Sequence, residues 1–143
     1  MDWYIQDIIK RALQEDIGHQ DITTDNLVDK EQRSRGVFLA KAAGIVAGIH
    51  VAQEVFRCLD DDIQFTVVKS DGEKIAPGDT LAVVAGRTRT LLKGERVSLN
   101  FLQRLSGIAT RTNHMVELIR YEKAEIVDTR KTTPGLRRLR VRL

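Results

Sequence analysis

The chain has 143 residues, 42% of them hydrophobic and 30% charged, which is typical of a globular protein and excludes wholesale disorder. No apolar run is long enough to span a membrane, and the first residues lack the basic and apolar regions of a signal peptide. The lone cysteine, Cys58, cannot form an internal disulfide, so we expect a cytoplasmic protein with no membrane partner.

Positive charge is concentrated in one part of the sequence. The net charge is +3, but residues 130–143 contain six Lys and Arg residues and no acid, which leaves residues 1–129 with a net charge of −3. Such a basic stretch can bind nucleic acid. It has no aromatic side chain for base stacking and no recognisable nucleic-acid-binding fold around it, so we expect no nucleic-acid partner.

The first part of the chain predicts two helices with a strand between them. Apolar residues at helical spacing favour an amphipathic helix over 3–15, with Asp2 as a cap and Gly18 as its end. Residues 36–43 predict a strand. A short helix is expected over roughly 49–59, because its apolar residues fall on one side.

The middle of the chain predicts strands followed by helices. Residues 63–67 alternate as a half-buried strand does, and residues 80–85 predict another strand after two turns. Apolar side chains then predict a helix over 92–105. Ser106-Gly107 is expected to break or kink it, because glycine is costly inside a helix, and a second helix is expected over 108–121.

One more strand is expected at 124–127, Ala-Glu-Ile-Val, directly before a basic turn. The order of elements predicts an α+β fold, in which a small domain over residues 1–91 is followed by a helical connector and the first strand of an α/β unit.

The basic turn, Asp128 to Gly135, holds the strongest candidate site. In α/β proteins, ligand-binding groups gather where strands end. The Arg130 guanidinium can bind a carboxylate or phosphate through two hydrogen bonds, and the Lys131 ammonium adds a point charge. Thr129 and the two following threonines add hydroxyl donors. The alternative interpretation is a solvated basic turn without a ligand.

Other polar and charged residues are weaker candidates for a binding site. Arg96 can bind an anion or simply pair with Glu95, Glu54 or another surface acid. The histidines match no metal-ligand spacing, so we expect no metal held by the protein. Cys58 is expected in the core, and Asp60-Asp61-Asp62 at a solvated helix end.

Several segments together resemble one enzyme family, quinolinate phosphoribosyltransferase, also called carboxylating nicotinate-nucleotide pyrophosphorylase. Ser106 to Thr110 and Thr129 to Gly135 are the specific ones. In chain order the matching segments are Glu15 to Gly18, Asp21 to Thr24, Gly44 to Gly48, Asp71-Gly72, Pro77 to Asp79, Gly94 to Leu102, Leu105 to Thr110 and Asp128 to Leu136.

The resemblance implies a hammerhead-like N-terminal α/β domain over residues 1–110 and the start of an α/β barrel over residues 111–143. It implies a cytoplasmic homodimer that transfers the phosphoribosyl group of PRPP to quinolinate. The products are nicotinate mononucleotide, carbon dioxide and pyrophosphate, in NAD biosynthesis, and Mg²⁺ accompanies the PRPP.

The resemblance also implies roles for four residues. Thr129, Arg130 and Lys131 correspond to ligands of the substrate anions at the end of the first barrel strand. Arg96 corresponds to an arginine that one subunit of the dimer lends to the site of the other. The resemblance assigns no catalytic residue to this chain.

The sequence departs from the family after the basic turn. Family members continue with a helix, a glycine-rich segment and further barrel strands, whereas this sequence reads Arg138 to Leu143. We therefore expect a truncated, frame-shifted or split-gene product that is inactive alone. Three alternatives remain open: a non-catalytic dimerisation module, half of a split enzyme, and a relative associated with molybdenum transport that acts on another substrate.

Overall fold

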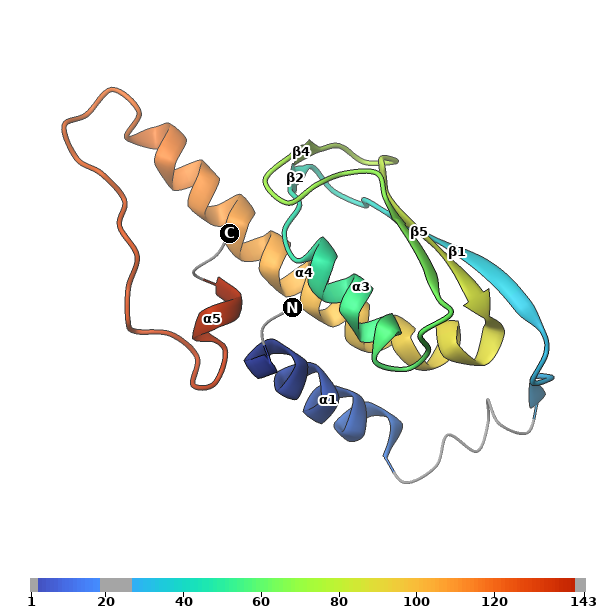
Figure 1. Ribbon diagram of the computed structural model, residues 1–143. Coiled ribbons are helices and arrows are strands. Elements are labelled where there is room, and N and C mark those ends of the chain that lie inside the picture. The colour runs from blue at the N-terminus through green and yellow to red at the C-terminus, as the bar shows by residue number, and fades with distance from the viewer. Residues whose placement is uncertain (1–2, 19–26, 141–143) are drawn as a thin grey trace.

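The computed structural model describes residues 3–18 and 27–140. It contains both helices and strands, which confirms the predicted α+β class (Figure 1). The elements in order are α1 (Trp3–Ile17), β1 (Arg33–Leu39), β2 (Gly44–Ile45), α3 (Ile49–Arg57), β3 (Gln64–Val67), β4 (Lys74–Ile75), β5 (Thr80–Arg87), α4 (Thr88–Leu118) and α5 (Arg137–Arg140).

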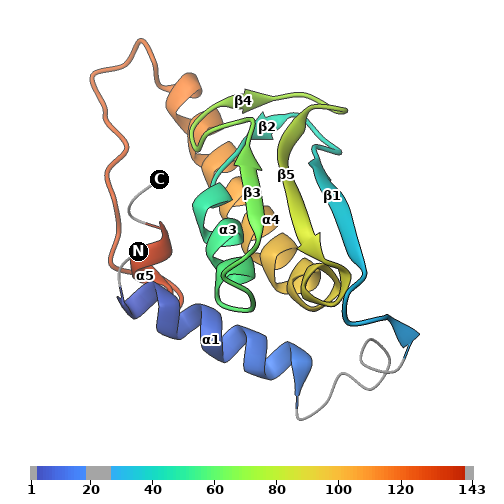
Figure 2. The same cartoon turned by 45° about the vertical axis from the view of Figure 1, so that its right-hand side comes forward.

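The sheet is antiparallel, with the strand order β1-β5-β3, and α3 and α4 cover one of its faces (Figure 2). The first apolar cluster fills the space between them, with Phe38 from the sheet against Phe56 of α3 and Leu102 of α4. Strands β2 and β4 form a separate short ladder. The expected strands at 36–43, 63–67 and 80–85 are confirmed, with ends shifted by a few residues.

The helix α1 packs on the other side of α3 and α4. Its buried residues Ile5, Ile9 and Leu13 are spaced four apart, as predicted for an amphipathic helix. They join a second apolar cluster with residues of α3 and α4. Gly18 ends α1 with a φ of 60°, which suits glycine, whereas Asp2 lies outside the described residues.

The expected break at Ser106-Gly107 is wrong, because α4 runs through both residues as one helix. A glycine inside a helix costs only about 1 kcal/mol, which packing readily offsets. The Ser106 hydroxyl also bonds both backbone groups of Ala47, at 3.0 Å to its nitrogen and 3.2 Å to its oxygen. These bonds tie the middle of α4 to the segment before α3.

Glycine is needed where α3 and α4 approach most closely. A Cβ at Gly94 of α4 would lie 2.6 Å from a ring carbon of Phe56, which is fully buried in α3. The missing side chain lets the two helices come together, and it places the start of α4 against the sheet.

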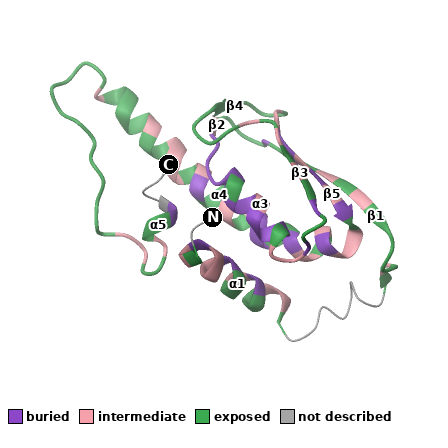
Figure 3. Cartoon of the chain, in the orientation of Figure 1, coloured by how far each residue is buried: buried purple, intermediate pink, exposed green. Residues whose placement is uncertain are grey.

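The expected strand at 124–127 is also not formed. These residues have no regular secondary structure and are exposed (Figure 3), with Ile126 44% and Val127 78% accessible. A strand needs a neighbour for its backbone groups, and no other segment among residues 3–18 and 27–140 pairs with this one.

Within these same ranges no helix has the length and apolar character to cross a bilayer.

Candidate anion-binding site

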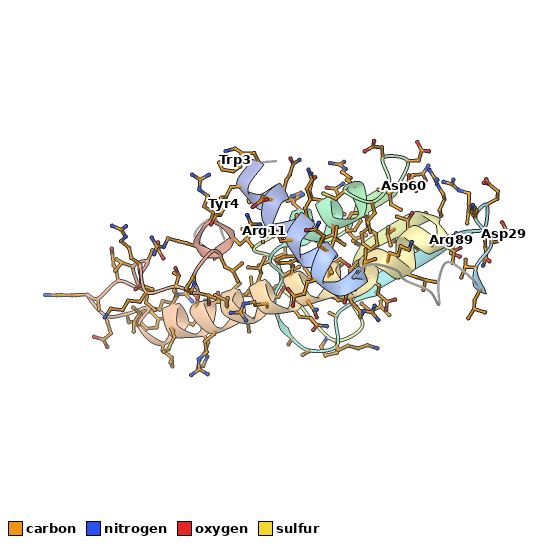
Figure 4. All side chains as sticks on the ribbon, turned by 90° about the horizontal axis from the view of Figure 1, so that it is seen from below. Trp3, Tyr4, Arg11, Asp29, Asp60 and Arg89 are labelled. Carbon is orange, nitrogen blue, oxygen red and sulfur yellow. The ribbon has the colours of Figure 1, made fainter. Side chains whose placement is uncertain are left out.

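The basic turn is held beside α1 and α4, although the chain leading to it is exposed. After α4 the chain loops outward and then returns to the start of α1 (Figure 1). Leu136 and Leu139 pack into the second apolar cluster, and Leu139 is only 5% exposed. The Tyr4 hydroxyl donates to the Gly135 carbonyl at 3.1 Å, and Figure 4 shows Tyr4 where α1 meets the ribbon of α5.

Hydrogen bonds inside the turn fix its backbone. The Thr129 N–H donates to the Asp128 carboxylate at 2.7 Å, and the Lys131 N–H donates to the Thr129 hydroxyl oxygen at 3.1 Å. The Thr132 N–H donates to the Arg130 carbonyl at 3.0 Å. The side chains of Arg130 and Lys131 remain exposed. The turn therefore presents two cations to solvent from a folded-back backbone.

Two further arginines contact the turn. Arg104 of α4 donates to the Thr133 hydroxyl at 3.2 Å. Arg137 donates to the Thr132 hydroxyl at 3.1 Å and to the Arg130 carbonyl at 2.8 Å. Sequence reasoning missed both residues. Arg104 offered no local signal, because its partner lies 29 residues away, and Arg137 was indistinguishable from the other arginines of the basic stretch.

The cations of the turn have no acidic partner within the described part of the chain. Arg130, Lys131 and Arg137 form no salt bridge there. The acid closest in sequence, Asp128, accepts a backbone N–H. Unpaired guanidinium and ammonium groups beside a free hydroxyl proton on Thr129 can bind a carboxylate or a phosphate.

Arg96 lies apart from this turn. It is on α4, 69% exposed, and its Nε lies 3.1 Å from a carboxylate oxygen of Asp16. The partners expected from the sequence were Glu95, Glu54 or another surface acid, and Asp16 is such a surface acid. Glu54 instead accepts a hydrogen bond from Gln6 at 2.8 Å. Exposed ion pairs contribute little, so this one does not prevent Arg96 from binding an anion.

Arg104 lines a groove between α1 and α4. Arg96 precedes Arg104 on α4 by about 12 Å along the helix axis. The groove has a volume of about 350 Å³ and is lined by Asp16, Asn100 and Arg104, among others. Thr129, Arg130 and Lys131 thus lie together in the turn that Arg104 contacts. Arg96 lies apart from them on α4 and is not one of the residues that line this groove.

The expectation of a solvated helix end is wrong for Asp60. Its side chain is 5% exposed and binds Arg87 through both oxygens, at 3.1 and 3.2 Å. The Thr90 hydroxyl donates to it at 3.1 Å, and the Asp62 N–H also donates at 3.1 Å. Asp60 therefore joins the end of α3 to β5 and α4. This is a structural role, which sequence reasoning missed.

Cys58 and the histidines do not add to the site. Cys58 is partly buried against the second cluster, and burial, with a smaller effect of Glu54, raises the pKa of its thiol above the ordinary value of 9.0. His19 lies outside the described residues. Over residues 3–18 and 27–140, no group of three or more His, Cys, Asp or Glu side chains is arranged to hold a metal ion.

Comparisons with known proteins agree on one family. The family model "Quinolinate phosphoribosyl transferase, N-terminal domain" matches residues 21–106, and the model of the C-terminal domain matches residues 108–142. A probable carboxylating nicotinate-nucleotide pyrophosphorylase from Bacillus subtilis is 42% identical over 135 residues, covering 94% of this chain and 46% of the relative. The Synechocystis protein of the same name is 41% identical over 136 residues, with the same coverage.

Solved structures give the same result. NadC from Streptococcus pyogenes matches with a TM-score of 0.91 and 39% identity, over 97% of this chain and 50% of that one. The nicotinate-nucleotide pyrophosphorylase from Francisella tularensis matches with a TM-score of 0.89 and 35% identity, over 96% and 48%. The chain spans about half the length of these relatives. The resemblance seen in the sequence is confirmed, and the chain belongs to the quinolinate phosphoribosyltransferase family.

Proposed function

We propose that this chain supplies the N-terminal domain and the first substrate-binding turn of an enzyme that transfers the phosphoribosyl group of PRPP to quinolinate. Nicotinate mononucleotide, carbon dioxide and pyrophosphate are the products. We assign residues 1–110 to the N-terminal domain and residues 111–143 to the start of the barrel domain. The names of the relatives, carboxylating pyrophosphorylases and decarboxylating quinolinate phosphoribosyltransferases, support this reaction.

The observation that carries the proposal is a fixed turn with cations that lack acidic partners. Quinolinate has two adjacent carboxylates, and PRPP has a phosphate and a pyrophosphate, so a site that holds both must offset much negative charge. Arg130 can bind one carboxylate with two parallel bonds, and Lys131 can serve a second anionic group. The Thr129 hydroxyl accepts from the Lys131 N–H and keeps its own proton to donate.

We propose a different role for Arg96. In a cytoplasmic homodimer, it would bind a substrate anion in the site of the second subunit. Its exposure and its weak pairing with Asp16 support this role, because the guanidinium can exchange one carboxylate for another at little cost. Mg²⁺ would enter with PRPP. The described residues provide no carboxylate cluster for it, so we assign none of them to the ion.

The direct test is quinolinate binding by this chain, measured by isothermal titration calorimetry. A few charge-assisted bonds predict a dissociation constant of roughly 1 mM. The double variant Arg130→Ala and Lys131→Ala should abolish binding, while Lys123→Ala, an exposed cation outside the turn, should not. Equal binding by the double variant would refute the proposed site.

Turnover requires a separate experiment. We expect the chain alone to form no nicotinate mononucleotide, because the turn provides only part of the charge that the substrates need. Residues 1–139 joined to the remaining barrel of the Bacillus subtilis relative should restore the reaction. A chimera that folds and dimerises but stays inactive would favour a non-catalytic module instead.

A further inference from the structure

We propose that Arg137 is a positioning residue that sets the relative directions of the Arg130 and Lys131 side chains. The inference rests on the proposed function, because it concerns how the same turn meets the substrate anions. It assigns no chemistry to Arg137 itself.

The geometry locks one peptide group. The carbonyl of Arg130 belongs to the peptide that links Arg130 to Lys131, and it accepts from Arg137 Nη2 at 2.8 Å and from the Thr132 N–H at 3.0 Å. Rotation of this peptide would break both bonds. Since the two side chains leave the backbone on either side of it, its orientation decides where their charges lie.

The same guanidinium holds a second point of the turn. Arg137 Nε donates to the Thr132 hydroxyl at 3.1 Å, so one planar group contacts two positions that are two residues apart. A lysine has a single charged nitrogen and cannot reproduce this fork. The contact with Thr132 therefore distinguishes positioning from simple positive charge.

The backbone around Arg137 is anchored to the core. Arg137 begins α5, and its neighbour Leu136 and the buried Leu139 pack into the second apolar cluster. Arg104 and Tyr4 hold the same segment through Thr133 and Gly135. These contacts with α1 and α4 limit the movement of Arg137. Through Arg137 they also limit the movement of the cationic turn.

Arg137 also keeps its charge available. The two groups to which it donates are uncharged, and it forms no ion pair within the described ranges. Its charge therefore adds to that of Arg130 and Lys131. We expect the removal of Arg137 to lower quinolinate affinity about tenfold, because one positive charge is lost and the Arg130 and Lys131 side chains are no longer held in one arrangement.

The test combines order and binding on the full chain by NMR. Without ligand, Arg137→Ala should lower the backbone order parameters of residues 130–132 from about 0.85 to below about 0.6, with α1 and the sheet unchanged. Arg137→Lys should lose the same order but recover part of the affinity through its charge. Arg120→Ala removes an equal charge from an arginine that pairs with Glu117, and should change neither quantity.

Each result decides between two claims. Order parameters that Arg137→Ala leaves unchanged, or a turn already disordered in the wild type, overturn the positioning role. Wild-type binding with equal affinity in Arg137→Ala overturns it as well, while the proposed function stands. No quinolinate binding by the wild type overturns the proposed function, and the role of Arg137 in that reaction falls with it.

Discussion

Residues 3–18 and 27–118 are held in a very different way from residues 119–140. The first region has a paired sheet, long helices and two apolar clusters, whereas the second is mostly exposed and contacts the first through Leu136, Leu139 and a few hydrogen bonds. The cations proposed to bind substrate lie in the second region. Stability therefore depends mainly on the first region, whereas the proposed anion binding depends on the second, so substitutions should separate the two properties.

The largest effect on stability is expected from Asp60→Ala. The substitution leaves the Thr90 hydroxyl without its acceptor where α3, β5 and α4 meet, and it leaves Arg87 with the exposed Asp62 in place of a buried carboxylate. Because Asp60 is buried and Arg87 half exposed, we expect a loss of about 3 kcal/mol in the free energy of unfolding. Urea unfolding measures it, and quinolinate affinity of the folded variant should not change.

Asp62→Ala is the matched control for this network. Asp62 is exposed and lies 3.6 Å from the same guanidinium. Its loss should cost less than about 0.5 kcal/mol. Equal effects at both positions would mean that burial of Asp60 does not determine its contribution.

The second effect concerns the contact of α3 with α4. Gly94→Ala would push a Cβ against the buried Phe56 ring, and we expect a loss of about 2 kcal/mol. Gly107→Ala, in the same helix, meets no atom within 4 Å and should instead stabilise by up to about 1 kcal/mol. Thermal unfolding of both variants gives the comparison, and the same sign for both would contradict it.

A smaller and more local effect is expected from Leu139→Ala. The substitution weakens the docking of the second region, so the loss should not exceed the docking free energy, about 1–2 kcal/mol. Hydrogen exchange by mass spectrometry should show faster exchange over residues 129–138 and an unchanged sheet.

Residues 124–129 should exchange rapidly even in the wild type. Strong protection there in a monomer would mean that these residues pair as a strand.

The smallest effect is expected at Cys58. Burial raises the pKa of its thiol, so the fold favours the neutral form. This contribution to stability is complete below the ordinary pKa of 9.0 and is lost as the pH rises through the higher pKa of the folded state. Alkylation of the native chain at pH 9 should therefore be slower than that of a cysteine peptide, and an equal rate would show that the thiol is not buried.

The sequence predicted the elements whose apolar spacing is regular. Helix α1 and strand β3 were found because their apolar side chains recur with the period of a helix and of a strand, and β1 and β5 were found as short apolar runs. Ser106-Gly107 was misjudged, because local propensity does not include the bonds from Ser106 to Ala47. The strand at 124–127 was misjudged because its residue types say nothing about whether a neighbouring strand is present.

The candidate site was predicted only as a set of residue types. Thr129, Arg130 and Lys131 stand together in the sequence, so their proximity needed no structure. Arg104 and Tyr4 could not be connected with them, since those contacts join residues 29 and 131 positions apart. Asp60 was misjudged for the same reason, because its partners lie 27 and 30 residues away.

The bond between Tyr4 and Gly135 has a consequence for synthesis of the protein. It closes a loop of 131 residues, and the contact cannot form until the later residue has left the ribosome. The sheet and the packing of α3 on α4 depend on residues made earlier, so they can fold first. The candidate turn should then be fixed after the sheet and these helices, on a scaffold that already exists.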